Sequence, residues 1–383
     1  MRASLVVVLL SVGCSGSLAG GAPEEDQTTD SEVVDARIGD DAAAVDDAVA
    51  DDAATDTIVL ADDAPKPAPD AVTDVAPPPS AKKKVLDFFA ANAGKRTLSG
   101  IHNRHNAMPS QYTGQMHDIT GKYPAFWSAD FLFEPGDIAK RQAIVDQAKV
   151  EWTHGAVVQL MFHACPPDVG EPCNWDPGLL HHPLSDAQWS DLVTSGGKLN
   201  LAWKARLDLI AKYLKQLQDA GVAPLFRPIH EMNQGAFWWG GRPGATGTRK
   251  LYQLTHDYLV KDKGLDQLIW VWDVQDLSWD FASYDPGEAY YDIAALDVYD
   301  GSGYTQAKYD AMKKVSPTRP IAIGECQQLP TSDVLTKQPA WAFFMGWSEL
   351  VAENNGAASI KNLFLASNVV TLDEMPGWIA SGK

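Results

Sequence analysis

Residues 201–230 read LAWKARLDLIAKYLKQLQDAGVAPLFRPIH and combine the two patterns that decide the fold. Apolar residues recur every three or four positions over Leu201–Ala220, which predicts an amphipathic helix. The apolar run Val222–His230 predicts a buried strand. A helix that leads into a buried strand is typical of proteins in which parallel strands alternate with crossover helices.

The same alternation extends over about 300 residues. Further apolar runs predict strands at Thr97–Asn103, Pro124–Phe131, Ala156–Ala164, Leu268–Val274, Ile293–Tyr299, Ile321–Gly324 and Lys361–Ala366. Amphipathic segments predict helices at Ile138–Trp152, Thr248–Lys261, Gln306–Val315 and Ala340–Ala352. Eight strands joined by helices favour a closed (β/α)8 TIM barrel. A doubly wound open sheet is the alternative, and it is disfavoured because residues 98–102, LSGIH, lack the glycine spacing of a dinucleotide-binding turn.

Acidic residues are concentrated in one part of this 383-residue chain. The sequence has 31 Lys and Arg against 50 Asp and Glu, a formal net charge of -19, and residues 21–80 alone have 17 acids and two bases. Because residues 1–20 add only Arg2, residues 81–383 have a net charge of -5. Nucleic-acid binding calls for a clustered basic face, so we expect no nucleic-acid partner.

The first twenty residues have the layout of an export signal. Arg2 is followed by an apolar run over residues 5–10 and by small residues up to Cys14. The run is far shorter than the ~20 apolar residues of a membrane-spanning helix. Cys14 resembles the lipidated Cys of bacterial lipoproteins, although Ser11 stands where their pattern usually has Leu. We expect an extracellular or cell-surface protein, with either a lipid anchor at Cys14 as its one membrane contact or simple secretion.

Residues 21–80 contain no aromatic residue and consist mostly of Ala, Asp, Thr, Val and Pro. Such a segment cannot bury enough apolar surface to offset its lost conformational entropy, so we predict a disordered linker before one folded domain over residues 81–383. Export permits disulfides, and Cys165 and Cys173 bracket a loop short enough to bridge. A zinc site at these cysteines is the less favoured alternative, because no second closely spaced Cys or His pair accompanies them.

Two predicted strands each deliver a glutamate at their carboxyl end. Glu231 follows the strand that ends at His230, and Glu325 follows Ile321–Gly324. Catalytic groups of a barrel lie at this end of the strands, and two facing carboxylates are what glycoside hydrolysis requires. Structural carboxylates are the alternative. A zinc-protease motif is excluded because Gln234 stands where the second His of H-E-x-x-H belongs, and no Gly-x-Ser-x-Gly elbow supports an esterase.

The residues around both glutamates resemble glycoside hydrolase family 26, whose best-known members are endo-β-1,4-mannanases. Residues 226–240 read FRPIHEMNQGAFWWG and are similar to the family's acid/base motif. Residues 285–299 are similar to its sixth strand, and residues 323–325 to its nucleophile strand. The resemblance covers roughly residues 83–383 and implies a retaining hydrolase that needs neither cofactor nor metal. We expect it to act as a monomer on a polysaccharide, β-mannan first.

By this resemblance Glu231 is the general acid/base and Glu325 is the nucleophile. The mechanism requires their carboxyl groups about 5–5.5 Å apart and their pKa values shifted in opposite directions. The resemblance further implies that His230 and Tyr299 hydrogen-bond the nucleophile. Strict strand alternation would point His230 away from Glu231, so we expect the chain to leave regular strand geometry here.

Other residues are expected to contact the sugar or to support the site. The resemblance places His163 near the bound sugar, with a packed core histidine as the alternative. Arg227 and Asn233 are expected to hold Glu231, or else to be supporting polar groups of the barrel mouth. Aromatic faces stack on the C–H faces of pyranose rings, and Trp238 and Trp347 are the preferred candidates.

Two positions depart from the family pattern. Ala236 stands where an aromatic residue is common, and Ser348 stands where the mannanases commonly have Arg after the Trp. Both departures remove substrate contacts and leave the cleavage chemistry intact. A β-glucan or β-xylan substrate therefore remains open, as does a non-catalytic glycan-binding protein, which the presence of both glutamates disfavours.

Overall fold

The computed structural model describes residues 79–378. The predicted export signal with Cys14 and almost all of the predicted linker lie outside the described residues. Among residues 79–378, no helix combines the length and apolar character needed to cross a bilayer.

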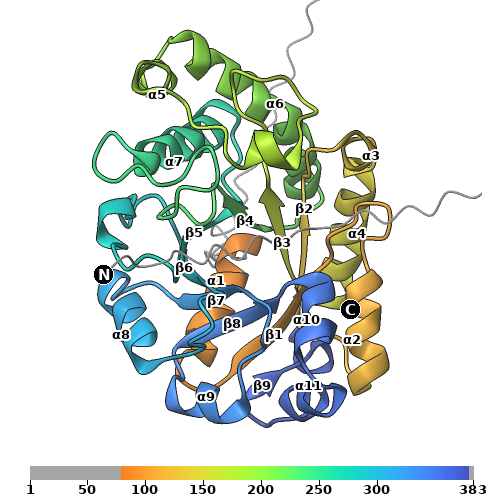
Figure 1. Ribbon diagram of the computed structural model, residues 1–383. Coiled ribbons are helices and arrows are strands. Elements are labelled where there is room, and N and C mark those ends of the chain that lie inside the picture. The colour runs from red at the N-terminus through yellow and green to blue at the C-terminus, as the bar shows by residue number, and fades with distance from the viewer. Residues whose placement is uncertain (1–78, 379–383) are drawn as a thin grey trace, which may run out of the picture. The chain divides into compact units, whose positions relative to one another are not determined.

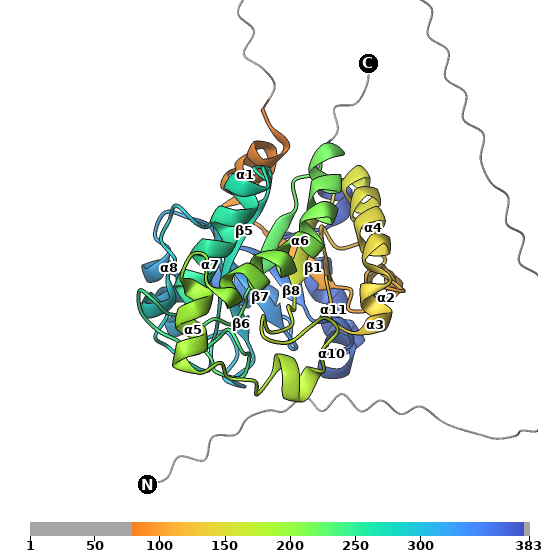
Figure 2. The ribbon, with the colours of Figure 1, turned by 90° about the horizontal axis from the view of Figure 1, so that it is seen from above.

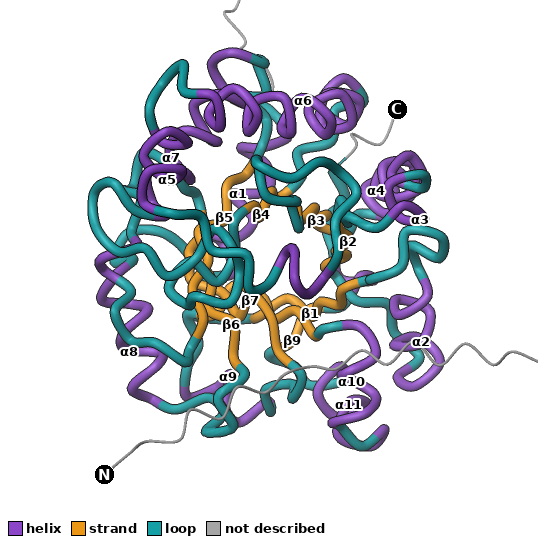
Figure 3. The backbone as a smooth tube through the Cα atoms, turned by 45° about the horizontal axis from the view of Figure 1, so that its top comes forward, coloured by secondary structure: helices purple, strands orange, loops and turns teal. Residues whose placement is uncertain are grey.

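Eight parallel strands form a closed barrel, which Figure 3 shows as a ring of strands inside a ring of helices. Each strand pairs with the next, and β1 pairs with both β8 and β2. The strands are β1 (Thr97–His102), β2 (Phe126–Asp130), β3 (Val157–Phe162), β4 (Leu225–Pro228), β5 (Ile269–Gln275), β6 (Ile293–Val298), β7 (Ile321–Cys326) and β8 (Trp341–Gly346). The predicted (β/α)8 barrel is confirmed. A two-residue strand, β9 (Val369–Val370), extends the pairing beside β1.

The helices cover the outside of the barrel (Figures 1 and 2). They are α1 (Ala81–Asn92), α2 (Gln111–Thr120), α3 (Pro135–Ile138), α4 (Arg141–His154), α5 (Asp186–Val193), α6 (Lys198–Asp219), α7 (Thr248–Asp257), α8 (Gln306–Val315), α9 (Ser332–Lys337), α10 (Ser348–Asn354) and α11 (Ala357–Phe364). Helix α6 buries Leu207, Ile210 and Leu214 at helical spacing and leaves Leu209 exposed, which is the pattern that predicted it.

The eighth strand lies elsewhere than predicted. Residues Lys361–Ala366 belong largely to α11, whose Ile360, Leu363 and Phe364 are buried at helical spacing. The segment Ala340–Ala352, predicted as one helix, contains β8 and the first five residues of α10. All six residues of β8 are buried, because a strand of a parallel barrel is covered on both faces. A short run that is apolar throughout has no alternation to distinguish it from a buried helix.

Different parts of the chain lie at the two ends of the barrel. Helix α1 lies at the amino ends of β5 and β6, where Lys82 donates to the Leu268 carbonyl at 2.8 Å and to Asp292 at 2.7 Å. At the carboxyl ends, β7 contains Glu325 near its last residue, and β4 leads into the loop that contains Glu231. The carboxyl end is therefore where the candidate site is assembled.

Candidate active site

The chain leaves regular geometry directly after β4. Ile229 and Glu231 have φ values of 53° and 49°, in the left-handed region that non-glycine residues rarely adopt. Such residues cost about 1–3 kcal/mol each, which the surrounding packing must offset. The Glu231 N–H donates to Asp273 at 2.9 Å and helps to hold this turn. The predicted departure from strand geometry at His230 is confirmed.

Glu325 is buried at the end of β7 and is held by three hydrogen bonds. The Tyr299 hydroxyl donates to Oε2 at 2.9 Å, and both terminal nitrogens of Arg227 donate to Oε1 at 2.9 Å. Burial raises the pKa of Glu325 to about 7, although Arg227 opposes the shift. Three donors that stabilise the ionised form suit a carboxylate that must act as a nucleophile.

Glu231 has fewer donors and stays protonated to higher pH. Gln234 donates to its Oε2 at 2.9 Å, and among residues 79–378 no Arg forms an ion pair with it. Burial raises the pKa of Glu231 to about 8, and the charges of Glu325 and Asp273 add to the shift. The prediction of opposite pKa shifts is wrong, because the two carboxyl groups share one buried cluster and both pKa values rise. Their order still fits an acid at Glu231 and a nucleophile at Glu325.

Arg227 lies at the centre of the buried carboxylates. Its side chain is fully buried and donates to Asp273 at 3.1 Å and to Asp297 at 2.6 Å, in addition to Glu325. Arg227 therefore holds the predicted nucleophile, whereas the sequence led us to expect it beside Glu231. Gly324 makes room for this cluster, since a Cβ atom there would lie 2.4 Å from Asp273 Oδ2 and 2.5 Å from Asp297 Oδ1.

Histidine rings form one wall of the site. His163 follows β3, and its ring contacts the buried carboxylate of Asp130 at the end of β2. Its centroid lies 4.5 Å from that of His230. Among the described residues, no hydrogen bond joins His230 to Glu325, so of the two residues expected to bind the nucleophile only Tyr299 does so here. Burial lowers the pKa of His230 well below its usual value, which keeps that ring neutral.

The tryptophans differ from the sequence expectation. Trp238 is buried, packs edge-on against Trp203 and Trp239, and donates to the Ala164 carbonyl at 2.7 Å. It has no free face, so its expected role as a sugar platform is wrong. Trp347 is partly exposed and stacks on His102, with ring centroids 4.2 Å apart.

Sequence analysis missed Trp175, which is 36% exposed beside the histidine wall. Its centroid lies 6.0 Å from those of His163 and Phe237. Trp175 lies in the loop after β3, where Cys165 and Cys173 form a disulfide. Sequence analysis also missed Asp130, Asp273 and Asp297. An acidic residue within an otherwise apolar strand was the signal that could have identified them.

Three supporting residues have structural partners. Asn233 donates to the carbonyls of Gln275 and Ser278, each at 2.7 Å, and not to Glu231. Ser348 is fully buried and donates to the His102 carbonyl at 3.0 Å. The Ala236 carbonyl accepts a hydrogen bond from the N–H of His181 at 3.0 Å. Neither departure from the family pattern disturbs the carboxylates.

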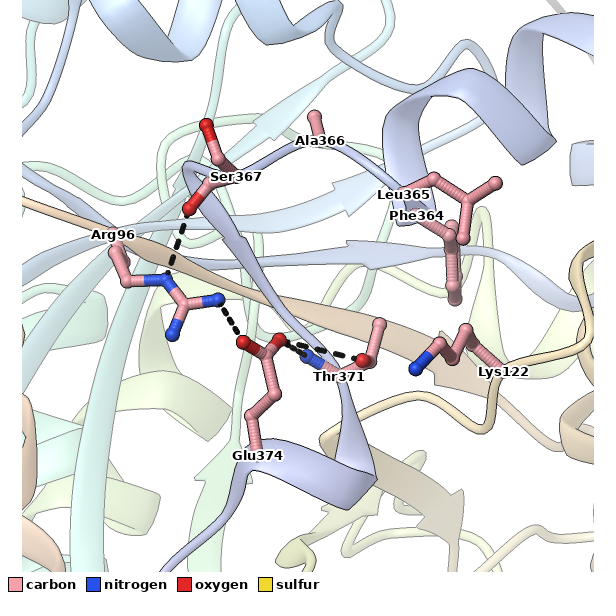
Figure 4. A pocket seen from close by; sticks show the side chains of 8 residues that line it. All are labelled: Arg96, Lys122, Phe364, Leu365, Ala366, Ser367, Thr371 and Glu374. Carbon is pink, nitrogen blue, oxygen red and sulfur yellow. Dashed lines mark hydrogen bonds and ion pairs between the residues drawn. The ribbon is translucent and has the colours of Figure 1, made fainter.

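A separate surface hollow of about 560 Å³ lies away from these residues (Figure 4). It is near the amino ends of β1 and β2, and it is lined by Arg96, Lys122, Phe364, Leu365, Ala366, Ser367, Thr371 and Glu374. Arg96 is paired with Glu374 at 2.6 Å, and Lys122 with Asp373. The hollow contains neither catalytic candidate, so the chemistry belongs to the carboxyl end of the barrel.

Comparison with known proteins agrees with this geometry. A family model described as glycosyl hydrolase family 26 matches residues 75–374. The chain is 30% identical over 310 residues to a mannan endo-1,4-beta-mannosidase of Thermothelomyces thermophilus, a match that covers 77% of the chain and 61% of that protein. It is 26% identical over 308 residues to the Bacillus subtilis enzyme of the same name, covering 73% of the chain and 83% of that protein.

Solved structures show the same fold. The GH26A protein of a Muricauda species superposes with a TM-score of 0.73 at 36% identity, covering 77% of this chain and 97% of that one. A beta-mannanase from a symbiotic protist of the termite Reticulitermes speratus, solved with gluco-manno-oligosaccharide, gives 0.70 at 28% identity, covering 79% and 97%.

Proposed function

Because this chain belongs to glycosyl hydrolase family 26, we propose that it hydrolyses β-1,4-mannosidic bonds within mannan chains with retention of anomeric configuration. That it is a glycoside hydrolase follows from the family. The mechanism is supported by the different hydrogen bonding of two carboxyl groups that lie at the carboxyl end of the barrel. Glu325 accepts three hydrogen bonds, whereas Glu231 has one amide donor and the higher pKa.

In the first step, ionised Glu325 attacks the anomeric carbon while protonated Glu231 gives its proton to the leaving oxygen. The glycosidic bond breaks, and a bond from the sugar to Glu325 forms. Tyr299 and Arg227 orient the attacking carboxylate. Because they also stabilise its charge, Glu325 is ionised at a pH where Glu231 still has a proton to give.

In the second step, Glu231 is ionised and takes a proton from water. The water attacks the anomeric carbon, the bond to Glu325 breaks, and the sugar leaves with its original configuration. Both carboxyl groups then return to their starting protonation states. The cycle requires only the groups of this chain and one water molecule.

The relatives support mannan as the polymer, since both curated proteins described above are mannan endo-1,4-beta-mannosidases. A β-glucan or β-xylan is the second candidate. It is favoured by Ala236 and Ser348, which stand where mannanases commonly have substrate-binding side chains. Specificity depends on such contacts, whereas cleavage of any of the three polymers uses the same two carboxylates.

The test is release of reducing sugar by the full chain from galactomannan, glucomannan, mixed-linkage β-glucan and β-1,3-xylan, with Glu325→Ala as the control. We expect release from the mannans that the substitution abolishes, and product that first appears with retained configuration by NMR. Release from glucan or xylan alone would reassign the polymer. Inverted product, or full activity of Glu325→Ala, would refute the double displacement.

For the location of the protein, we propose export, supported by the signal-like residues 1–20 and by Cys14 after small residues. Cell fractionation checks this proposal. Lipidation predicts that the chain is recovered with membranes and that Cys14→Ser releases it. Recovery of the unprocessed chain in the cytoplasm would contradict export.

A further inference from the structure

Two of the thirteen tryptophans are far more exposed than packing requires. Trp175 is 36% exposed and Trp279 is 50% exposed. Both lie in loops that follow barrel strands, Trp175 after β3 and Trp279 after β5. Leu277, beside Trp279, is 56% exposed. Neighbouring large apolar groups that stay exposed at the mouth of a site are typical of ligand contacts.

The strand order places these tryptophans on opposite sides of the catalytic pair. Glu231 follows β4 and Glu325 lies on β7, so the line between them divides the ring of strands into two arcs. The short arc contains β5 and β6, and the long arc contains β8, β1, β2 and β3. Trp279 belongs to the short arc, whereas Trp175 and Trp347 belong to the long arc. A sugar chain that crosses the catalytic pair therefore passes from one group of rings to the other.

The loop with Trp279 is anchored to the segment that contains the acid/base. Asn233, two residues after Glu231, accepts from the Gln275 N–H at 2.7 Å and donates to the carbonyls of Gln275 and Ser278. Trp279 stacks on the buried ring of Phe281 with centroids 6.1 Å apart. This side chain is held from behind, so its exposure is a fixed feature of the mouth.

The long arc contributes a wall of rings to the site. Trp175, Trp347 and His230 all lie within 6.3 Å of the His163 ring, centroid to centroid, and form a continuous wall. The glycosyl group that becomes bonded to Glu325 needs such an enclosure. The short arc is then left for the part of the polymer that departs.

We propose that Trp279 is the stacking surface for the sugar on the leaving-group side of the cleaved bond. This inference rests on the proposed function. Ala236 stands where the family pattern commonly has an aromatic residue, so the acid/base segment has no ring at that position. Trp279 supplies a ring from the neighbouring loop. The ligand is the flat C–H face of a β-linked pyranose, which needs a ring that is braced on one side and free on the other.

The experiment compares a substrate that has no sugar on the leaving-group side with one that has sugars there. In an aryl β-mannobioside the group that leaves is a phenol, whereas mannohexaose places sugars on both sides of the bond. Trp279→Ala in the full chain should lower kcat/KM for mannohexaose about tenfold, as expected for one lost aromatic contact, and leave the aryl mannobioside within about twofold. Trp279→Phe, which keeps a ring, should retain most of the activity on mannohexaose.

Two variants make the comparison specific. Trp175→Ala, on the long arc, should lower kcat/KM for both substrates. Leu365→Ala removes an equally exposed side chain, 53% exposed, near the amino end of β1, and should change neither value. Equal losses on both substrates by Trp279→Ala, or no loss on mannohexaose, would overturn the inference. Inactivity of the unsubstituted chain on both mannosides would instead refute the proposed function.

Discussion

At the scale of single residues, Glu231 and Glu325 share one buried cluster, yet their neighbours favour different protonation states. Arg227 and Tyr299 donate to Glu325, and Gln234 alone among the side chains of the described residues donates to Glu231. Burial raises both pKa values, to about 8 for Glu231 and about 7 for Glu325. In the proposed mechanism the acid must be protonated and the nucleophile ionised, so the working form exists between these pKa values.

This order predicts a narrow bell-shaped pH profile for kcat/KM. Activity should fall below about pH 7 as Glu325 gains a proton, and above about pH 8 as Glu231 loses one. Tyr299→Phe removes a hydrogen bond to a charged group, worth about 1.5–3 kcal/mol, and should move the acid limb up by about one pH unit or more. The measurement is kcat/KM on mannohexaose from pH 4 to 10, because a sugar leaving group needs the proton of Glu231.

Because the acid limb then approaches the basic limb, the optimum of the Tyr299→Phe profile should lie at higher pH and its maximum should be lower. An acid limb that does not move would show that the hydroxyl does not stabilise the ionised nucleophile.

At the scale of elements, a buried ion cluster joins the ends of β5 and β6 to α8. Lys308 on α8 donates to Asp276 at 2.7 Å and to Asp300 at 2.6 Å, and its side chain is 1% exposed. Asp276 also accepts from the N–H groups of Tyr299 and Asp300, at 3.0 and 3.1 Å. The cluster thus fixes the backbone of Tyr299, whose hydroxyl donates to Glu325.

Lys308→Met should destabilise the protein strongly, because it leaves Asp276 buried without a countercharge. Breaking a buried pair in this way costs about 3–5 kcal/mol of unfolding free energy, measurable by urea denaturation. The double variant Lys308→Met with Asp276→Asn should recover part of the loss. Lys314→Met, an exposed position of the same helix, is the matched control and should stay within about 0.5 kcal/mol. A loss as small as that of the control would contradict the role of the cluster.

At the scale of the whole molecule, regular repetition made the barrel predictable. Seven strands match predicted segments because each is an apolar run between helical patterns; five lie wholly within their segments, while β5 and β7 extend one and two residues beyond theirs. The eighth was misplaced, because β8 is apolar throughout and α11 presents a similar run. At the site, the placement of Glu231 and Glu325 at the carboxyl end of the barrel could be predicted from their positions at strand ends. The long reach of Arg227 toward β7 and the packing of Trp238 could not, since both depend on neighbours distant in sequence.

The whole chain also combines a neutral-substrate site with a strongly acidic N-terminal region. Residues 21–80 have 17 acids and two bases, whereas every side chain assigned to the site comes from residues 79–378. Mannan, the proposed substrate, is uncharged, and charges act over only about 8 Å at physiological salt, so this acidity should neither attract nor repel it. A variant that begins at residue 79 should therefore match the full chain in kcat/KM on mannohexaose to within about twofold, at both 0.05 M and 0.5 M salt. Glu325→Ala in each background provides the inactive reference. A clear fall in the shortened variant, or a salt dependence found in the full chain alone, would show that residues 1–78 take part in catalysis.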